Sequence, residues 1–147
     1  MDFSWPQSIT YSGNADWSGV PSYDQEMFCK RRLPGVKVQK VVLPSHPCCG
    51  ERGLFAAHTW NRFDVIGEYT GRVVNEEQIQ GSGDYRLAIF PSATYNIYVD
   101  AEDIGNETRF INDFRGAAAG PNVTFRHTYI TGRPAVLVVV TSSISEG

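Results

Sequence analysis

Short apolar runs, each closed by glycine, proline or a polar turn residue, constrain this chain more than any other feature. Most of them alternate apolar and polar residues, the period of a half-buried strand, whereas the run from Ala135 to Val140 is apolar throughout. The expected strands are residues 36–39, 53–57, 65–69, 72–74, 85–90, 95–100, 122–125 and 135–140. The chain is therefore predicted to be mostly β, built from short strands and tight turns.

Helix is scarce in the same pattern. Asn75, followed three residues later by Gln78, predicts one capped turn that ends at Ile79. Residues 104–113 predict a second short helix. The apolar residues 41–43 run into Pro44, so the first strand is expected to continue to a turn there.

Composition excludes several classes of protein. The chain has 147 residues, enough for one domain, and a formal charge of −3 gives no global attraction to nucleic acid. No stretch approaches the ~20 apolar residues that cross a membrane. Three cysteines without C-x-x-C spacing predict neither a disulfide framework nor a structural zinc site. A reduced, intracellular chain, nuclear or cytoplasmic, is expected.

Two segments near the N-terminus differ from the rest in composition. Residues 1–28 carry Trp5, Tyr11, Trp17 and Tyr23 without helical or strand period, and are interpreted as an aromatic-rich arm laid on the body or as a frayed terminus. Residues 30–40 hold five basic side chains and no acid. This basic segment is interpreted as a solvated face or, less simply, as a guide for an acidic partner.

Four motifs follow one another along the chain. They are Gly50-Glu51-Arg52-Gly53-Leu54-Phe55-Ala56, Glu68-Tyr69-Thr70-Gly71, Val99-Asp100-Ala101 followed by Gly105-Asn106-Glu107-Thr108-Arg109-Phe110-Ile111-Asn112, and Pro121-Asn122-Val123-Thr124-Phe125. In this order they resemble the SET domain of protein lysine methyltransferases over residues 36–147. The sequence Asn112-Asp113-Phe114-Arg115-Gly116, with His46-Pro47 earlier, is similar to a SET subgroup that has Asn-Asp-Tyr-Arg-Gly in place of Asn-His-Ser.

The resemblance implies a fold and an activity. The fold is a β-clip of several small sheets with short helices and a pseudoknot-like C-terminal region, here spanning residues 29–147. The activity is S-adenosylmethionine-dependent methylation of a lysine in a histone or non-histone protein. Cofactor and lysine enter from opposite faces and meet through a narrow channel. Neither a membrane nor direct contact with nucleic acid is implied.

The resemblance also assigns residues to the site. Tyr69 would line the lysine channel and Tyr85 would lie where cofactor and lysine meet. The cofactor would be held by Arg52, Gly53, Leu54, Arg109, Asn112 and Asp113, and no metal is implied. Alternatives remain for several of them: Tyr69 and Tyr85 as ordinary strand aromatics, Asn112 as a turn residue, and Arg109, with Asn106, as a brace of its own segment. Asp100 is interpreted as a turn acid.

Departures from the family leave other functions open. Glu51-Arg52-Gly53 stands where Gly-x-Gly is usual, and Asp113 stands where histidine is usual. The family continues beyond a segment like 144–147 to an Asp-Tyr-Gly with the catalytic tyrosine, so residues 1–147 alone are expected to be C-terminally truncated and weakly active or inactive. The rivals are a catalytically silent SET-fold module that binds a peptide and an unrelated β-rich peptide-binding domain.

Overall fold

Four small β-sheets and two 3₁₀ turns make up the protein. The computed structural model describes residues 5–13, 15, 32–79, 81–91, 96–130 and 132–147. The strands are β1 (Thr10–Tyr11), β2 (Val36–Lys40), β3 (Arg52–Ala56), β4 (Val65–Glu68), β5 (Arg72–Asn75), β6 (Arg86–Pro91), β7 (Asn96–Asp100), β8 (Ile104–Gly105), β9 (Val123–Ile130) and β10 (Arg133–Val140). The prediction of a mostly β chain with several small sheets is confirmed. Pseudoknot-like threading remains a prediction.

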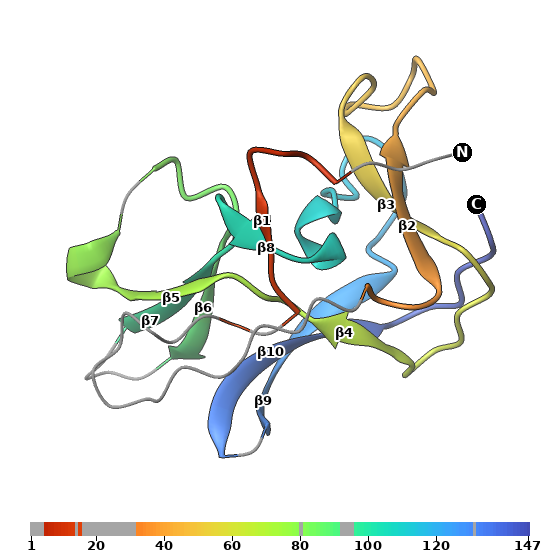
Figure 1. Ribbon diagram of the computed structural model, residues 1–147. Coiled ribbons are helices and arrows are strands. Elements are labelled where there is room, and N and C mark those ends of the chain that lie inside the picture. Colours follow the sequence, from red (N-terminus) through yellow and green to blue (C-terminus); the bar gives the residue numbers. More distant parts are fainter. Residues whose placement is uncertain (1–4, 14, 16–31, 80, 92–95, 131) are drawn as a thin grey trace.

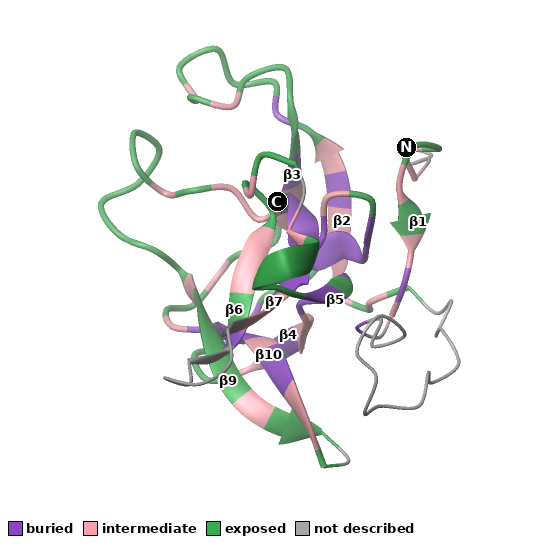
Figure 2. Cartoon of the chain, turned by 90° about the vertical axis from the view of Figure 1, so that its left-hand side faces the viewer, coloured by how far each residue is buried: buried purple, intermediate pink, exposed green. Residues whose placement is uncertain are grey.

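The apolar run predicted as a buried strand is the centre of the sheet β4–β10–β9, which lies at the bottom of Figure 1. Both neighbours of β10 are antiparallel to it. Val136, Val138 and Val140 are at most 1% exposed, which explains why β10 has no polar alternation. Figure 2 shows this contrast, with buried β10 beside largely exposed β9.

Strand β9 is longer than the sequence analysis expected. Residues 122–125 were the expected strand, but pairing with β10 runs from Val123 to Ile130. The second half carries polar and exposed side chains because β9 is an edge strand, so its residues lack the apolar pattern that marks a buried strand.

A second three-stranded sheet, β5–β7–β6, lies beside the first. The predicted capped turn is present between β5 and β6 as the 3₁₀ helix η1 (Glu76–Gln78). Asn75 Oδ1 accepts from the Gln78 amide and Gln78 Oε1 accepts from the Asn75 amide, each at 3.0 Å. This reciprocal capping box confirms the interpretation of Asn75 and Gln78.

Strands β2 and β3 form a two-stranded antiparallel sheet. The expected extension of the strand through residues 41–43 is wrong, because β2 ends at Lys40. Val41 is buried and exchanges hydrogen bonds with the turn before β3, but Val42 and Leu43 are 78% and 59% exposed. The chain turns away at this point because Pro44 and Pro47 shape the loop that leads back to β3.

The described part of the N-terminal segment lies against the body. β1 pairs in parallel with β8, and Trp5 packs edge-on against Tyr11 and Phe110 at centroid distances of 5.0 and 5.6 Å. The Arg32 guanidinium lies 4.8 Å from the Trp5 ring centroid and 4.2 Å from that of Tyr11. In Figure 1, β1 and β8 stand between the outer sheets. Trp17, Tyr23, Lys30, Arg31 and Tyr95 lie outside the described residues.

Gly71 of one motif and Asn106 of another fix the junction between the sheets. A Cβ added to Gly71 would lie 2.4 Å from the Asp100 carbonyl oxygen, so the motif Glu-Tyr-Thr-Gly ends where two backbones touch. The Asn106 amide donates to the Glu68 carbonyl at 2.9 Å and caps the 3₁₀ helix η2 (Glu107–Phe110). This short helix lies inside the predicted range 104–113. Together these contacts place the Tyr69 strand end next to η2.

Candidate functional site

Two adjoining cavities collect all of the predicted site residues. A cavity of about 860 Å³ is lined by the predicted residues Arg52, Tyr69, Tyr85, Arg109, Asn112 and Asp113. A smaller, more apolar cavity of about 220 Å³ is lined by Gly53 and Leu54, and again by Asn112 and Asp113. The segment 111–113 therefore forms the wall between the two. The larger volume lies in the range of small-molecule sites, about 300–1,000 Å³.

Tyr69 lies at the inner end of the larger cavity. Its side chain is only 5% exposed, and its hydroxyl donates to the Tyr85 carbonyl oxygen at 2.8 Å. Phe125 of β9 packs edge-on against its ring, with centroids 5.6 Å apart. Burial raises the pKa of the Tyr69 hydroxyl well above its usual range, and the Arg109 guanidinium opposes this only in part. Tyr69 is therefore protonated at neutral pH.

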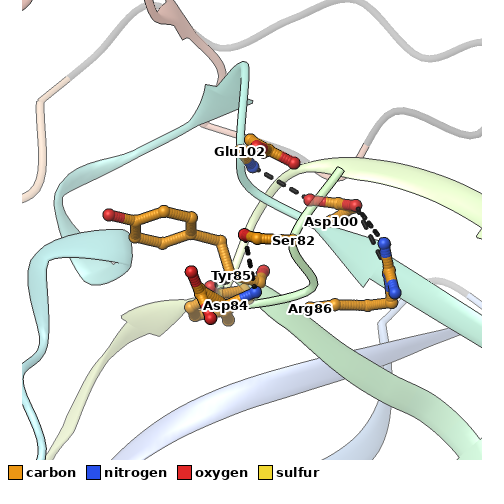
Figure 3. Close-up of polar contacts among 7 residues, drawn as sticks. Ser82, Asp84, Tyr85, Arg86, Asp100 and Glu102 are labelled. Carbon is orange, nitrogen blue, oxygen red and sulfur yellow. Dashed lines mark hydrogen bonds and ion pairs between the residues drawn. The ribbon is translucent and has the colours of Figure 1, made fainter. Parts of the chain in front are cut away.

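Tyr85 is the residue before β6 and is 36% exposed, so it is not the strand residue that the sequence predicted. Figure 3 shows its ring pointing away from the ion pair between Arg86 and Asp100, whose nitrogen and oxygen are 3.3 Å apart. Asp100 also accepts from the Glu102 amide at 3.0 Å, which confirms its interpretation as a turn acid. The Arg86 and Asp100 side chains are thus paired with each other and not with the Tyr85 ring.

Arg109 reaches the cavity from the last turn of η2, and its backbone there is held by the Asn106 cap. Nε donates to the Ala101 carbonyl at 2.7 Å and Nη2 to the Glu102 carbonyl at 3.1 Å. The guanidinium carbon lies 4.2 Å from the Tyr85 ring centroid. Arg109 thus braces the backbone of residues 101–102, while the assignment of Arg109 as a cofactor ligand stays a prediction.

The close approach of β3 and the segment 111–113 depends on Gly53. A Cβ at this position would lie 3.0 Å from Asn112 Nδ2, a contact tighter than most side chains tolerate. Asn112 Nδ2 itself donates to the Arg52 carbonyl at 3.3 Å. The glycine therefore allows the Asn112 side chain to reach the backbone of β3 at the wall between the cavities.

Asp113 is engaged by its own turn. Its carboxylate accepts from the Arg115 amide at 2.9 Å and from the Arg115 guanidinium at 2.6 Å. The backbone hydrogen bond from Arg115 is the main cause that holds the pKa of the Asp113 carboxyl below its usual range. Because the side chain is occupied, Asp113 would meet a ligand through its main chain.

Several residues of the larger cavity were not predicted from the sequence. The acids among them are Glu51, Asp84, Glu102 and Asp103, and the remaining contributors include Pro6, Ser8, Ile9 and Phe125. The only sequence signal was the acidic run Asp100-Ala101-Glu102-Asp103, which precedes the motif containing Asn106. The acids outnumber Arg52 and Arg109, so the cavity favours a cationic group.

Of the three histidines, His46 lines the smaller cavity, whereas His58 and His127 line neither cavity. His46 Nδ1 accepts from the Cys48 amide at 3.0 Å, His58 packs on Trp60, and His127 Nε2 bonds to the Ala88 carbonyl at 2.6 Å. Among the described residues, no group of three or more His, Cys, Asp or Glu side chains is arranged to hold a metal ion. No helix in the described part of the chain is both long and apolar enough to cross a membrane.

Comparison with protein families matches the chain to one of them. The family described as SET domain matches residues 51–147, about two thirds of the chain. The match covers the motifs of β3, β4, η2 and β9 that surround the two cavities. It begins at Glu51, which itself lines the larger cavity.

Solved structures with a similar fold include Polycomb Repressive Complex 2 of the fungus Chaetomium thermophilum. Bound to GSK126, it gives a TM-score of 0.61 and 25% identity, over 80% of this chain and 15% of that chain. Apo ctPRC2 with two mutations in Ezh2 gives 0.60 and 25%, over 76% and 14%. An autoinhibited ctPRC2 bound to S-adenosylmethionine gives 0.60 and 24%, over 80% and 14%, and at this identity it shows a shared fold alone.

Curated proteins with sequence similarity are of a different kind. Probable pectin lyase A of Aspergillus flavus and probable pectin lyase C of Aspergillus oryzae are each 29% identical over 75 residues, 49% of this chain. The chain spans about 20% of the length of these relatives. A likeness over so small a share of those proteins says nothing about the cavity residues.

Proposed function

Because the chain belongs to the SET-domain family, we propose that it is an S-adenosylmethionine-dependent protein lysine N-methyltransferase domain. The observation that carries the proposal is the larger cavity, where Tyr69, Tyr85 and Asn112 share one lining although they are far apart in sequence. The Asn112-Asp113-Phe114-Arg115-Gly116 sequence supports a place in the SET subgroup that has Asn-Asp-Tyr-Arg-Gly. The substrate would be a lysine in a histone or another protein.

The residues present fit the cofactor. Gly53 lets the Asn112 side chain lie close to the backbone of β3, and Asn112 lines both cavities. Carboxylates at Glu51, Asp84 and Glu102 suit a ligand that carries a positive charge. S-adenosylmethionine would supply a methyl group on a positively charged sulfur. The backbone near Arg52 and Gly53 and the side chain of Asn112 would hold it.

Tyr69 would orient the substrate amine. Its one proton is donated to the Tyr85 carbonyl, so the lone pairs of the hydroxyl oxygen are left to accept an N–H hydrogen bond. A free lysine has a pKa of about 10.4 and must lose its proton to become a nucleophile. At the buried Tyr69 end of the cavity, desolvation and a positively charged neighbour would both disfavour the ammonium, so the amine would give up its proton to water before it attacks the methyl carbon. The nitrogen lone pair is then aimed by position, without a strong base.

The setting of the domain is part of the proposal. Cys48 and Cys49 are free thiols among the described residues, which supports a reducing, nuclear or cytoplasmic location. The Polycomb complexes that share the fold support a chromatin context. Histone and non-histone lysines therefore both belong in the test.

The test combines cofactor binding with methyl transfer. Calorimetry with S-adenosylmethionine comes first, followed by transfer of a labelled methyl group to a mixed pool of histones and cytosolic proteins. Tyr69→Phe removes only the hydroxyl, and we expect it to lower the transfer rate about 100-fold, as loss of alignment does. Tyr98→Phe in β7 is the matched control and should leave the rate unchanged.

The outcomes separate the competing functions. Binding of cofactor and peptide without any transfer would replace the proposal by the silent SET-fold module. Absence of S-adenosylmethionine binding by the folded protein would favour an unrelated peptide-binding role. Equal transfer rates for Tyr69→Phe and the wild type would remove Tyr69 from the catalytic residues.

A further inference from the structure

We propose that Arg109 is a positioning residue that holds Tyr85 and, through it, the hydroxyl of Tyr69. Its link to catalysis rests on the proposed function, but its structural part does not. The proposal replaces the expectation that Arg109 binds the cofactor. It follows from a continuous set of contacts that joins η2 to the inner end of the larger cavity.

The first step is the fixed position of the guanidinium. Arg109 is 7% exposed, and it donates through Nε and Nη2 to the carbonyls of Ala101 and Glu102. These two carbonyls belong to the turn that follows β7. Because the guanidinium is planar, hydrogen bonds to two successive carbonyls fix the orientation of its plane. Two of its donor nitrogens are thereby directed to the backbone and away from a ligand.

The second step is the contact with the Tyr85 ring. The guanidinium carbon lies 4.2 Å from the ring centroid, well within the ~6 Å at which a cation attracts an aromatic face. Tyr85 is more than a third exposed, so few packing contacts restrict its ring. The fixed guanidinium supplies the surface on which that ring rests.

The third step passes from Tyr85 to Tyr69. The Tyr85 carbonyl accepts from the Ala101 amide at 3.0 Å and from the Tyr69 hydroxyl at 2.8 Å. Ala101 is therefore bonded through its carbonyl to Arg109 and through its amide to Tyr85. A shift of the Ala101 peptide would move the acceptor of the Tyr69 proton, and with it the direction in which the Tyr69 lone pairs point.

Arg86 provides a matched control for Arg109. It is the residue directly after Tyr85, it is comparably enclosed with a 15% exposed side chain, and its recorded ion-pair partner is the carboxylate of Asp100. Replacing Arg86 removes a guanidinium from the same neighbourhood without removing the cation that lies over the Tyr85 ring. A general effect of lost positive charge would appear in both variants.

The test compares Arg109→Gln, Arg109→Lys and Arg86→Gln in the whole protein. Ring-labelled tyrosine NMR reports the surroundings of Tyr69 and Tyr85, calorimetry reports the affinity for S-adenosylmethionine, and kinetics separate kcat from KM. We expect Arg109→Gln to shift the signals of both tyrosines and to lower kcat about 10- to 100-fold, with cofactor Kd and peptide KM within about threefold. Arg86→Gln should leave the Tyr69 signal in place.

Arg109→Lys keeps a cation near the ring but loses the planar fork, so it should fold and recover part of the lost kcat. Unmoved Tyr69 and Tyr85 signals in the folded Arg109 variants would overturn the proposal. A cofactor Kd that rises more than tenfold while kcat at saturation is unchanged would instead make Arg109 a ligand. If the wild type transfers no methyl group, the proposed function fails, and the NMR comparison still decides whether Arg109 positions the tyrosines.

Discussion

Gly71 shows how one residue without a side chain fixes the geometry of the site. The nearest atoms to an added Cβ are the carbonyl oxygen and carbon of Asp100, at 2.4 and 2.6 Å, and the Ala101 nitrogen at 2.9 Å. All three are backbone atoms, which cannot rotate away. The same turn carries the Ala101 and Glu102 carbonyls that receive Arg109, so Gly71 sets the distance between β5 and the cavity wall.

We therefore expect Gly71→Ala to lower the free energy of unfolding by about 3 kcal/mol, at the upper end of the usual overpacking cost. Urea unfolding measures the change. Gly120→Ala is the control, because nothing lies within 4 Å of a Cβ at Gly120. A loss of equal size in both variants would show that the close approach at Gly71 is not the cause.

Tyr69 makes the stability of the protein depend on pH in alkaline solution. Burial raises the pKa of its hydroxyl in the folded state, whereas in the unfolded chain the pKa is about 10. Above that pH the unfolded state loses the proton first, so stability is fully present below pH 10 and falls as pH rises toward the folded pKa. In this pH range, ionisation of the hydroxyl favours the unfolded state.

The free energy of unfolding should therefore fall more steeply with rising pH for the wild type than for Tyr69→Phe. Between pH 9 and pH 11 the wild type should lose about 1 kcal/mol more than the variant, since one unit of pKa difference is worth about 1.4 kcal/mol. Urea unfolding at several pH values gives both slopes, and Tyr98→Phe serves as the reference tyrosine. Parallel slopes for wild type and Tyr69→Phe would mean that the phenol ionises as easily in the folded state.

At this scale the sequence predicted residues that belong to contiguous motifs. Tyr69, Asn112 and Gly53 belong to short motifs, and all of them line the two cavities. Phe125 ends the fourth motif but was not assigned to the site, and Asp84 lies in a turn outside the motifs, so only the folded chain brings these two residues to the cavity. Their roles in binding remain predictions.

The elements differ in how far local sequence determines them. Asn75 and Asn106 each cap a 3₁₀ turn, and the pattern around Asn75 identified η1 correctly. The continuous apolar run of β10 likewise identified a buried strand from local sequence alone. The far half of β9 was missed because an edge strand is defined by its neighbour and has no period of its own. Val42 was wrongly included in a strand because apolar composition alone does not tell a strand from an exposed loop.

The two caps allow a prediction about buried and exposed polar groups. Asn106 is fully buried, and its side chain satisfies the Glu68 carbonyl and the Thr108 amide. Asn106→Ala removes these two hydrogen bonds and a third from the Thr108 hydroxyl, all in a buried setting, and should cost about 2–3 kcal/mol. Asn75→Ala removes an exposed cap and should cost about 0.5–1 kcal/mol.

Chemical denaturation of the two variants checks this difference. The circular dichroism spectra in the absence of denaturant establish that both are folded. Equal losses for the two variants would mean that burial at Asn106 adds nothing to the capping interaction.

At the scale of the whole molecule, no sheet is larger than three strands among the described residues, and none has a core of its own. The shared core joins residues from several sheets, among them Ile66, Val73, Ile89 and Val138. Sequence periodicity predicts strands one at a time, and it could not give the order β4–β10–β9 or β5–β7–β6. That order depends on contacts between distant segments, for which the resemblance to the SET domain was the only guide.

The N-terminal residues that line the larger cavity couple two equilibria. Pro6, Ser8 and Ile9 form part of the wall of this cavity. The segment is held by hydrogen bonds that the Thr10 amide donates to the Asp103 carbonyl at 2.7 Å and the Ser12 amide donates to the Gly105 carbonyl at 2.9 Å. A molecule that touches this wall binds only while the segment is docked. By mass action, a ligand that contacts this wall would therefore stabilise the docked segment relative to the detached segment.

Amide hydrogen exchange makes this coupling measurable. If the cofactor contacts the Pro6–Ile9 wall, a concentration one hundred times its Kd should slow exchange at Thr10 and Ser12 by about 100-fold. Amides of Thr128 and Ala135, which are paired residues of β9 and β10 and line neither cavity, should keep their rates. Unchanged exchange at Thr10 and Ser12 under saturation would mean that the ligand does not touch the segment.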